Sequence, residues 1–358
     1  MRELQQDVGQ MIIAGFDGTT LPQSLTQSLQ NETLGGIVCF RRNLEEIEQI
    51  AALTQSIYDA SPTLPFVAID QEGGLVQRIK APLTVWPPMQ RVAETEDANF
   101  VAKVGEALND EIAWLGFNLN FAPVVDIHTE PTNPVIGNRS FGTTPKQVSR
   151  YAGAFLGGMA IAGMMPCAKH FPGHGDTAVD THLELPVLRT DLETLNAREL
   201  EPFRAMIQAK VPMIMTSHIL FPALDPTHPA TLSSPILNDL LRIRLGYDGI
   251  VITDDLNMRA IADHYAVEEI AARGLEAGVD IFLMCQHEER RVALTEALIA
   301  LGESSSLHRQ RIRLAAQRVR NGKKSWLRPW KRTTPLLDET LLAQHRDLLA
   351  QYNLLPLA

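Results

Sequence analysis

The chain has 358 residues, 45% of them hydrophobic and 21% charged, which is ordinary for a globular protein that buries a large core. Because 42 Asp and Glu residues outnumber 32 Lys and Arg, the net charge is −10, and this argues against nucleic acid or an anionic membrane as a partner. Three sparse cysteines, no apolar run near the ~18 residues of a membrane span, and no signal peptide lead us to expect a cytoplasmic protein.

Short apolar runs rich in β-branched residues recur along the chain, and stretches with helical periodicity separate them. Near-continuous apolar strands are typical of a parallel sheet that is covered on both faces. The eight runs are MIIAG (11–15), GIVCF (36–40), FVAID (66–70), FNLNFAP (117–123), MPCAKHF (165–171), VPMIMTSH (211–218), GIVITDD (249–255) and DIFLMC (280–285).

The segments between these runs predict amphipathic helices that pack on the sheet. Their apolar residues are spaced by three or four positions and so share one helical face. The clearest sets are Leu44, Ile47, Ile50, Leu53 and Ile57 after the second run, Phe100, Val104, Leu108, Ile112 and Leu115 before the fourth, and Val148, Tyr151, Phe155 and Met159 before the fifth.

Eight strands alternating with helices over this length predict an α/β protein with a single-domain (β/α)8 TIM-type barrel. A doubly wound open sheet is the structural alternative, but neither GxGxxG after the first strand nor GxxxxGK[ST] occurs. We assign residues 1–320 to the catalytic barrel. Residues 321–358 are rich in Pro, Trp and basic residues, and we expect them to form a C-terminal extension packed on the barrel.

Ionisable residues gather where five of the predicted strands end. In such barrels the carboxyl ends of the strands surround the active site, so five strands ending in this way predict one shared cavity. The residues are Asp70 and Arg78, Asp126 and His128, Lys169 and His170, His218, and Asp254 and Asp255.

Several of these residues also have a purely structural interpretation. Asp255 precedes LNMRAIAD, which reads like a helix start, so we expect Asp255 to be an N-cap and Asp254 to point into the barrel mouth. Asp126 and His128 could equally structure a loop by hydrogen-bonding backbone groups. His218 could be a buried histidine with both nitrogens satisfied, and the sequence leaves these alternatives open.

The stretch AKHFPGHGDTAVDTH (168–182) concentrates three histidines, a lysine and two aspartates. A metal site is disfavoured, because HxxxH places both ligands on one face only in a helix, and Pro172 with two glycines breaks helices. A polar loop without chemistry is a second interpretation, although long ordered loops are usually functional. Acid–base chemistry is favoured, because Asp180 lies two residues from His182 and can orient its imidazole.

The motifs resemble glycoside hydrolase family 3, specifically its single-domain β-N-acetylglucosaminidase branch. The resemblance covers about residues 8–285, and the KHFPGHGD…DTH and GIVITDDLNM stretches are its most specific parts. The matching segments, in chain order, are AIDQEGGLVQR, FAPVVDI, IGNRSFG, AKHFPGHGDTAVDTHLELP, MTSHILFPALD, TLSSPIL and LRIRLGYDGIVITDDLNM.

This resemblance implies a retaining, two-step mechanism with a covalent glycosyl-enzyme. Asp254 would be the nucleophile, His182 the general acid/base, and Asp180 the partner that holds the imidazole. Asp70 would hydrogen-bond sugar hydroxyls. The residues implied to bind the N-acetylglucosamine are Arg78, Arg139, Lys169 and His170.

The activity implied is that of an exo-β-N-acetylglucosaminidase that removes non-reducing N-acetylglucosamine from anhydromuropeptides during peptidoglycan recycling. A β-glucosidase, β-xylosidase or N-acetylglucosaminide phosphorylase of the same family is the alternative. We expect a small carbohydrate as the partner, a monomer, and neither metal nor cofactor. The chain departs from the branch at Leu75, where arginine is usual, and this loss of a donor is expected to affect contacts with the aglycone.

Overall fold

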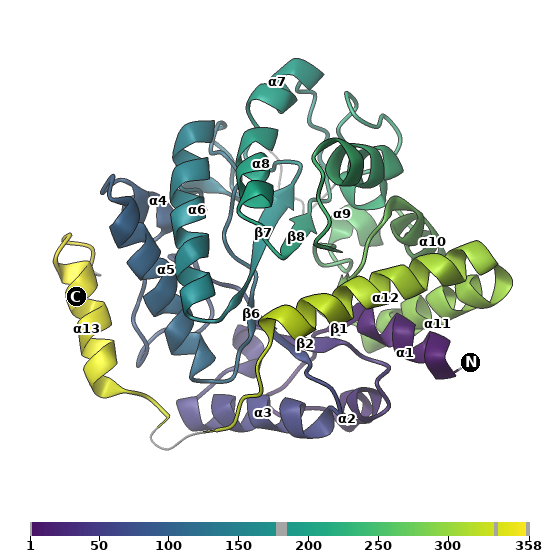
Figure 1. The fold of residues 1–358 in the computed structure, drawn as a ribbon, viewed down its shortest axis with the longest axis horizontal. Coiled ribbons are helices and arrows are strands. Elements are labelled where there is room, and N and C mark those ends of the chain that lie inside the picture. Colours follow the sequence, from purple (N-terminus) through teal and green to yellow (C-terminus); the bar gives the residue numbers. More distant parts are fainter. Residues whose placement is uncertain (1, 177–184, 333–335, 356–358) are drawn as a thin grey trace.

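Parallel strands form a barrel surrounded by helices in the computed structural model, which describes residues 2–176, 185–332 and 336–355 (Figure 1). Each of the predicted apolar runs contains one barrel strand. These strands are β1 (Ile12–Ala14), β2 (Gly36–Cys39), β3 (Phe66–Ile69), β6 (Leu119–Asn120), β7 (Met165–Phe171), β8 (Met213–Thr216), β9 (Ile250–Ile252) and β10 (Phe282–Met284).

The strands follow one another around the barrel in chain order. Among the described residues they form an eight-stranded parallel sheet with the order β10-β1-β2-β3-β6-β7-β8-β9. A parallel bridge between Ile252 and Ile281 brings the two edges together. The predicted (β/α)8 TIM-type barrel is therefore confirmed, and the open-sheet alternative is wrong.

The predicted amphipathic helices are present, and their apolar faces are buried against the barrel. The helices are α1 (Arg2–Gln10), α2 (Gln23–Gln30), α3 (Ile47–Ala60), α4 (Met89–Ala93), α5 (Ala98–Ala113), α6 (Pro145–Ile161), α7 (Leu192–Ala197), α8 (Leu200–Gln208), α9 (Arg259–Ala262), α10 (Val267–Ala277), α11 (Glu288–Ser304), α12 (Ser306–Trp326) and α13 (Glu339–Ala350), with short 3-10 turns η1 (Arg41–Asn43), η2 (Gly137–Arg139) and η3 (Ala230–Leu232) and a π-helix η4 (Pro235–Arg244). None of the helices in the described ranges is long and apolar enough to cross a membrane.

Alternate side chains of the strands fill the inside of the barrel, as the two-residue period of a strand requires. Ile13, Phe66, Met165 and Ile252 belong to one inner cluster. The N-terminal end of the barrel is covered by α12, whose buried Lys323 donates from Nζ to the carbonyl of Gly35 at 2.7 Å. That end is therefore packed, and the opposite end is left to form a site.

A short antiparallel hairpin follows the end of β3. It was not predicted from the sequence. It consists of β4 (Gln71–Gly73) and β5 (Val76–Gln77). The amide side chain of Gln71 donates to the carbonyl of Ile79 at 2.7 Å and accepts from the backbone of Arg78 at 2.8 Å, so the hairpin is fixed by its own side chains. This bracing gives the residues that follow β3 a defined position.

The C-terminal helix α13 lies against α5 on the outside of the barrel (Figure 1). His345 of α13 is buried, and its Nδ1 lies 2.9 Å from the Glu111 carboxylate of α5. The preceding helix α12 continues through the predicted boundary at residue 320. The division of the chain into residues 1–320 and 321–358 stays a prediction.

Candidate active site

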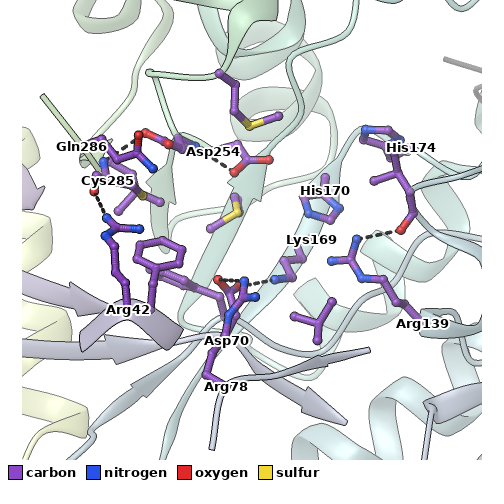
Figure 2. Close-up of a pocket in the computed structure, with 18 residues that line it drawn as sticks. Arg42, Asp70, Arg78, Arg139, Lys169, His170, His174, Asp254, Cys285 and Gln286 are labelled. Carbon is purple, nitrogen blue, oxygen red and sulfur yellow. Dashed lines mark hydrogen bonds and ion pairs between the residues drawn. The ribbon is translucent and has the colours of Figure 1, made fainter. Parts of the chain in front are cut away.

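A cavity of about 400 Å³ opens at the carboxyl ends of the barrel strands. Figure 2 shows the side chains of Asp254, His170, Lys169 and Asp70 gathered around it, although they come from the ends of three different strands, β9, β7 and β3. The lining residues are Phe40, Arg42, Asp70, Val76, Arg78, Phe121, Val135, Arg139, Lys169, His170, His174, Met215, Asp254, Asp255, Met258, Leu283, Cys285 and Gln286. The predicted cavity is therefore present, but the predicted ionisable residues of only three of the five strand ends line it, because Asp126, His128 and His218 are not among its lining residues.

Asp254 follows β9 and presents a carboxylate to this cavity. Its Oδ1 accepts the backbone N–H of Asp255 at 2.8 Å. Burial raises the pKa of Asp254, but favourable interactions, led by that with His170, outweigh burial, so the pKa lies below the ordinary value for aspartate. Asp254 is therefore ionised at neutral pH, as an attacking carboxylate must be.

Asp255 is not the N-cap that the sequence suggested. The helix α9 begins only at Arg259, with Met258 in the capping position and no side-chain cap. Asp255 instead accepts hydrogen bonds at 3.0 Å from the backbone N–H groups of Asn257 and Cys285. It lines the cavity beside Asp254 and braces the loops that follow β9 and β10.

A chain of alternating charges forms the floor of the cavity. Lys169 Nζ lies 2.8 Å from Asp70 Oδ1 and 2.6 Å from Glu72 Oε1, and Arg78 reaches Asp70 Oδ2 at 3.2 Å. Arg139 contacts both oxygens of Glu72, with N···O distances of 2.8 Å. Charged hydrogen bonds of this kind hold their donors in fixed directions.

His170 is held by Asp126, which comes from the loop after β6. The His170 Nδ1 lies 2.7 Å from Asp126 Oδ2, and the backbone N–H of His174 donates to Asp126 Oδ1 at 2.7 Å. Burial raises the pKa of Asp126, but His170 and His174 outweigh burial and hold it below the ordinary value. Because an ionised carboxylate only accepts, His170 Nδ1 is the donor, and Nε2 remains for the cavity.

The residues predicted to bind sugar are brought together by the fold. Asp70, Arg78, Arg139, Lys169 and His170 all line the cavity together with Asp254. Their assignment to sugar contacts stays a prediction. Asp180 and His182, the predicted acid/base pair, lie outside the residues that the structure describes.

His218 is the buried, satisfied histidine that was one of the two alternatives for it. Its Nδ1 lies 2.7 Å from Thr231 Oγ1, and its Nε2 lies 3.0 Å from the carbonyl oxygen of Asp255. Burial lowers the pKa of His218, so it is neutral and donates from Nε2 to this carbonyl. It supports the backbone next to Asp254 without lining the cavity.

Two charged residues of the site were not predicted from the sequence. Arg42 lines the cavity from η1, and its Nε lies 2.8 Å from Asp17 Oδ1. Glu72 lies behind the lining and joins Lys169 to Arg139. The position of Glu72 carried a signal, because residues two apart in an extended segment face the same side, as Asp70 and Glu72 do here.

No metal centre is formed by the described residues: they contain no group of three or more His, Cys, Asp and Glu side chains that could hold a metal ion. The carboxylate of Asp176 is used to brace loops. Its Oδ1 accepts from Thr129 Oγ1 at 2.9 Å, and its Oδ2 contacts Arg198 at 2.6 Å and Thr190 Oγ1 at 3.1 Å.

These features, a TIM barrel whose mouth holds a buried, ionised carboxylate and several hydrogen-bond donors, are typical of barrel enzymes that act on small polar substrates. The model of the Glycosyl hydrolase family 3 N terminal domain matches residues 3–321. The chain therefore belongs to glycosyl hydrolase family 3, and it is a glycoside hydrolase.

Relatives and solved structures agree with this assignment. Beta-hexosaminidase A of Pseudoalteromonas piscicida is 39% identical over 74% of this chain, which spans only 48% of that protein. A glycoside hydrolase family 3 beta-N-acetylglucosaminidase from Paenibacillus is 37% identical with a TM-score of 0.90, over 96% of this chain and 68% of that one. NagZ from Neisseria gonorrhoeae, solved in complex with N-trifluoroacetyl-D-glucosamine, is 31% identical with a TM-score of 0.75, over 94% of this chain and 97% of that one.

Proposed function

We propose that the protein is a retaining exo-β-N-acetylglucosaminidase. The observation that carries the proposal is the ionised carboxylate of Asp254, which faces a small cavity lined by Arg78, Arg139, Lys169 and His170. A beta-N-acetylglucosaminidase with the same fold and a relative bound to an N-acylglucosamine support the choice of sugar.

In the first step, one carboxylate oxygen of Asp254 attacks the anomeric carbon and the bond to the leaving oxygen breaks. The Asp255 N–H holds Oδ1, and Oδ2 accepts no hydrogen bond from the described residues. We assign the proton that the leaving oxygen needs to His182, with Asp180 as its partner. The product of this step is a covalent glycosyl-enzyme on Asp254.

In the second step, His182 removes a proton from water, and the resulting nucleophile attacks the anomeric carbon. The bond to Asp254 breaks, the carboxylate is restored, and the sugar leaves with the configuration it had in the substrate. His182 is the imidazolium when it gives the proton to the leaving oxygen and the neutral imidazole when it takes one from water, so at neither stage does it add a second anion beside Asp254. This differs from the usual pair of carboxylates in retaining glycosidases.

The charged floor of the cavity is suited to a single sugar with several hydroxyls. Each cation there is already paired with a carboxylate, as Lys169 is with Asp70, so its direction is fixed before the substrate arrives. The packed barrel interior beneath the cavity favours removal of a terminal sugar. We propose peptidoglycan fragments of the anhydromuropeptide type as the natural substrates, handled by a monomer in the cytoplasm.

The proposal is tested with matched aryl glycosides. The protein should hydrolyse 4-nitrophenyl β-N-acetylglucosaminide at least ~100-fold faster than the β-glucoside or β-xyloside. Those sugars lack the acetamido group, so hydrogen-bonding groups of the cavity that pair with it would be left unpaired. Adding inorganic phosphate should leave the rate and the free-sugar product unchanged. Preference for the glucoside, or release of a sugar 1-phosphate, would replace the proposed activity by that of a β-glucosidase or a phosphorylase.

A second measurement addresses the natural substrate. Purified anhydromuropeptides are incubated with the protein, and the products are separated and identified by mass spectrometry. Release of one N-acetylglucosamine per chain end supports the proposal. If chito-oligosaccharides are cleaved and anhydromuropeptides are not, the peptidoglycan assignment is wrong, although the sugar assignment stands.

A further inference from the structure

Glu72 occupies a special position in the site, because it touches two cations that line the cavity but does not line the cavity itself. Its side chain is only 3% exposed. Oε1 lies 2.6 Å from Lys169 Nζ and 2.8 Å from Arg139 Nη2, and Oε2 accepts from Arg139 Nε at 2.8 Å. One buried carboxylate therefore holds both side chains.

The two cations cannot keep these positions without a carboxylate between them. The side chain of Lys169 is 3% exposed and that of Arg139 is 13% exposed, so neither charge is well solvated. Two like charges in a poorly solvated place repel each other strongly unless an anion compensates them. Glu72 is the anion that contacts both.

The contacts of Lys169 leave donor capacity for a ligand. A lysine ammonium has three N–H donors; Lys169 donates one to Asp70 Oδ1 at 2.8 Å, and its Nζ forms an ion pair with Glu72 Oε1 at 2.6 Å. These two carboxylates hold Nζ in place, and the donor capacity that remains is available to the cavity that Lys169 lines. Burial raises the pKa of Glu72, but Arg139 and Lys169 outweigh burial and hold it at about 2, so Glu72 is ionised at neutral pH.

We propose that Glu72 is a positioning residue for sugar recognition, which sets the directions of Lys169 and Arg139 and so determines the affinity of the cavity for the N-acetylglucosaminyl group. Glu72 acts through these side chains and does not touch the sugar. The inference rests on the proposed function, because the ligand of the two donors is taken to be that sugar. It adds a residue from the unpredicted hairpin to the site.

The test uses Glu72→Gln, which keeps the length of the side chain and removes its charge. The readout is the inhibition constant of free N-acetylglucosamine in the 4-nitrophenyl assay, because this constant does not depend on how much of the enzyme is folded. We expect the constant to rise at least ~10-fold, since charge-assisted hydrogen bonds orient both donors. An inhibition constant within ~3-fold of the wild type would overturn the proposal, being under ~0.7 kcal/mol at 1.4 kcal/mol per tenfold.

Glu111→Gln is the matched control. Glu111 is another fully buried carboxylate with several partners: Oε2 accepts from the Thr84 N–H at 3.0 Å, and Oε1 contacts His345 at 2.9 Å. It belongs to α5 and does not line the cavity. We expect this variant to lose thermal stability while the inhibition constant stays at the wild-type value. A rise equal to that of Glu72→Gln would show that loss of any buried carboxylate weakens binding, and would contradict the proposal.

Glu72→Asp covers the case in which Glu72→Gln does not fold. It keeps the charge but is one methylene shorter, so it cannot reach both cations in their present places. An inhibition constant clearly above the wild-type value supports the positioning role, and an unchanged constant overturns it. If N-acetylglucosamine does not inhibit even the wild type, the proposed function fails instead.

Discussion

His170 donates from Nδ1 to the carboxylate of Asp126 at 2.7 Å, although the two residues are 44 positions apart in the sequence. The same carboxylate accepts the backbone N–H groups of His170 and His174. Asp126 therefore fixes both the loop after β7 and the tautomer of a cavity histidine. The sequence leaves open whether Asp126 structures a loop or belongs to the cavity; here it braces the loop after β7 and holds a histidine that lines the cavity, without lining the cavity itself.

Asp126→Asn should impair stability and activity together. Asparagine has one accepting oxygen and would turn an NH2 group toward at least one buried N–H, which costs about 1–3 kcal/mol of unfolding free energy. We also expect kcat/KM to fall, because His170 loses the charged partner that orients it. Thermal unfolding and steady-state kinetics with the aryl substrate measure the two effects.

Asp225→Asn provides the comparison for that variant. Asp225 is also a buried loop carboxylate: it accepts the Thr227 N–H at 2.8 Å and the Ser233 hydroxyl at 2.7 Å, but it does not line the cavity. It should lose stability and keep its kcat/KM per folded molecule. Equal kinetic losses in Asp126→Asn and Asp225→Asn would remove the case for a role of Asp126 in the site.

Leu75 is expected to influence which aglycone the enzyme accepts. It lies in the turn between β4 and β5, next to cavity residue Val76, and is 83% exposed. Leu75→Arg should raise kcat/KM for anhydromuropeptides, which carry carboxylates, by about 3–10-fold at low salt and less at high salt. The aryl substrate, which has no anionic aglycone, should be unaffected.

Ile161→Arg separates a local effect of Leu75→Arg from a general change of surface charge. Ile161 ends α6 and is 69% exposed, outside the cavity lining. It should leave both substrates unchanged. If Leu75→Arg and Ile161→Arg raise activity on anhydromuropeptides equally, the hairpin turn has no special contact with the aglycone.

His182→Ala tests the acid/base assignment through the leaving group. General acid catalysis contributes about 10²–10⁴-fold where the leaving oxygen needs a proton, and little where it is already acidic. Release of dinitrophenol in the first turnover should therefore fall by less than ~10-fold, whereas cleavage of a natural disaccharide should fall by ~10²-fold or more. Similar losses of rate on both substrates, measured by rapid mixing, would contradict the role of His182 as the general acid.

The buried carboxylates predict acid sensitivity. The pKa of Glu72 is about 2 in the folded protein against an ordinary value of 4.5, so its contribution to stability is complete above pH 4.5 and is lost as the pH falls toward 2. The melting temperature should therefore drop as the pH falls from 4.5 toward 2. Glu72→Gln should be less stable at pH 7 and show a shallower drop. Calorimetry that found parallel curves for both proteins would show that Glu72 is not the group responsible.

The sequence was informative where one pattern determines one element. The eight apolar runs predicted the barrel because strands buried on both faces leave a nearly continuous apolar signature. The hairpin at 71–77 was missed because its strands have three and two residues and are polar, as in Gln71 and Glu72. Asp255 was misassigned because a residue before an apolar segment looks like an N-cap, whereas the chain makes a further turn before Arg259.

The coupling of side chains could not be predicted in the same way. The contacts of Asp126 with His170, and of Glu72 with Arg139, join residues 44 and 67 positions apart. They depend on the course of two loops each, which local sequence patterns do not determine. The identities of Lys169 and Asp70 were found through their places at strand ends, but their pairing became visible only in three dimensions.

The most direct test of the account is to trap the glycosyl-enzyme with a 5-fluoro glycosyl fluoride of N-acetylglucosamine and map the label by mass spectrometry of peptides. We predict one sugar per chain, on Asp254. Asp254→Ala should take up no label and lose at least ~10⁴-fold in kcat, while Asp255→Asn should still be labelled. A label on Asp255, or full activity without any label on Asp254, would contradict the central claim that Asp254 is the nucleophile.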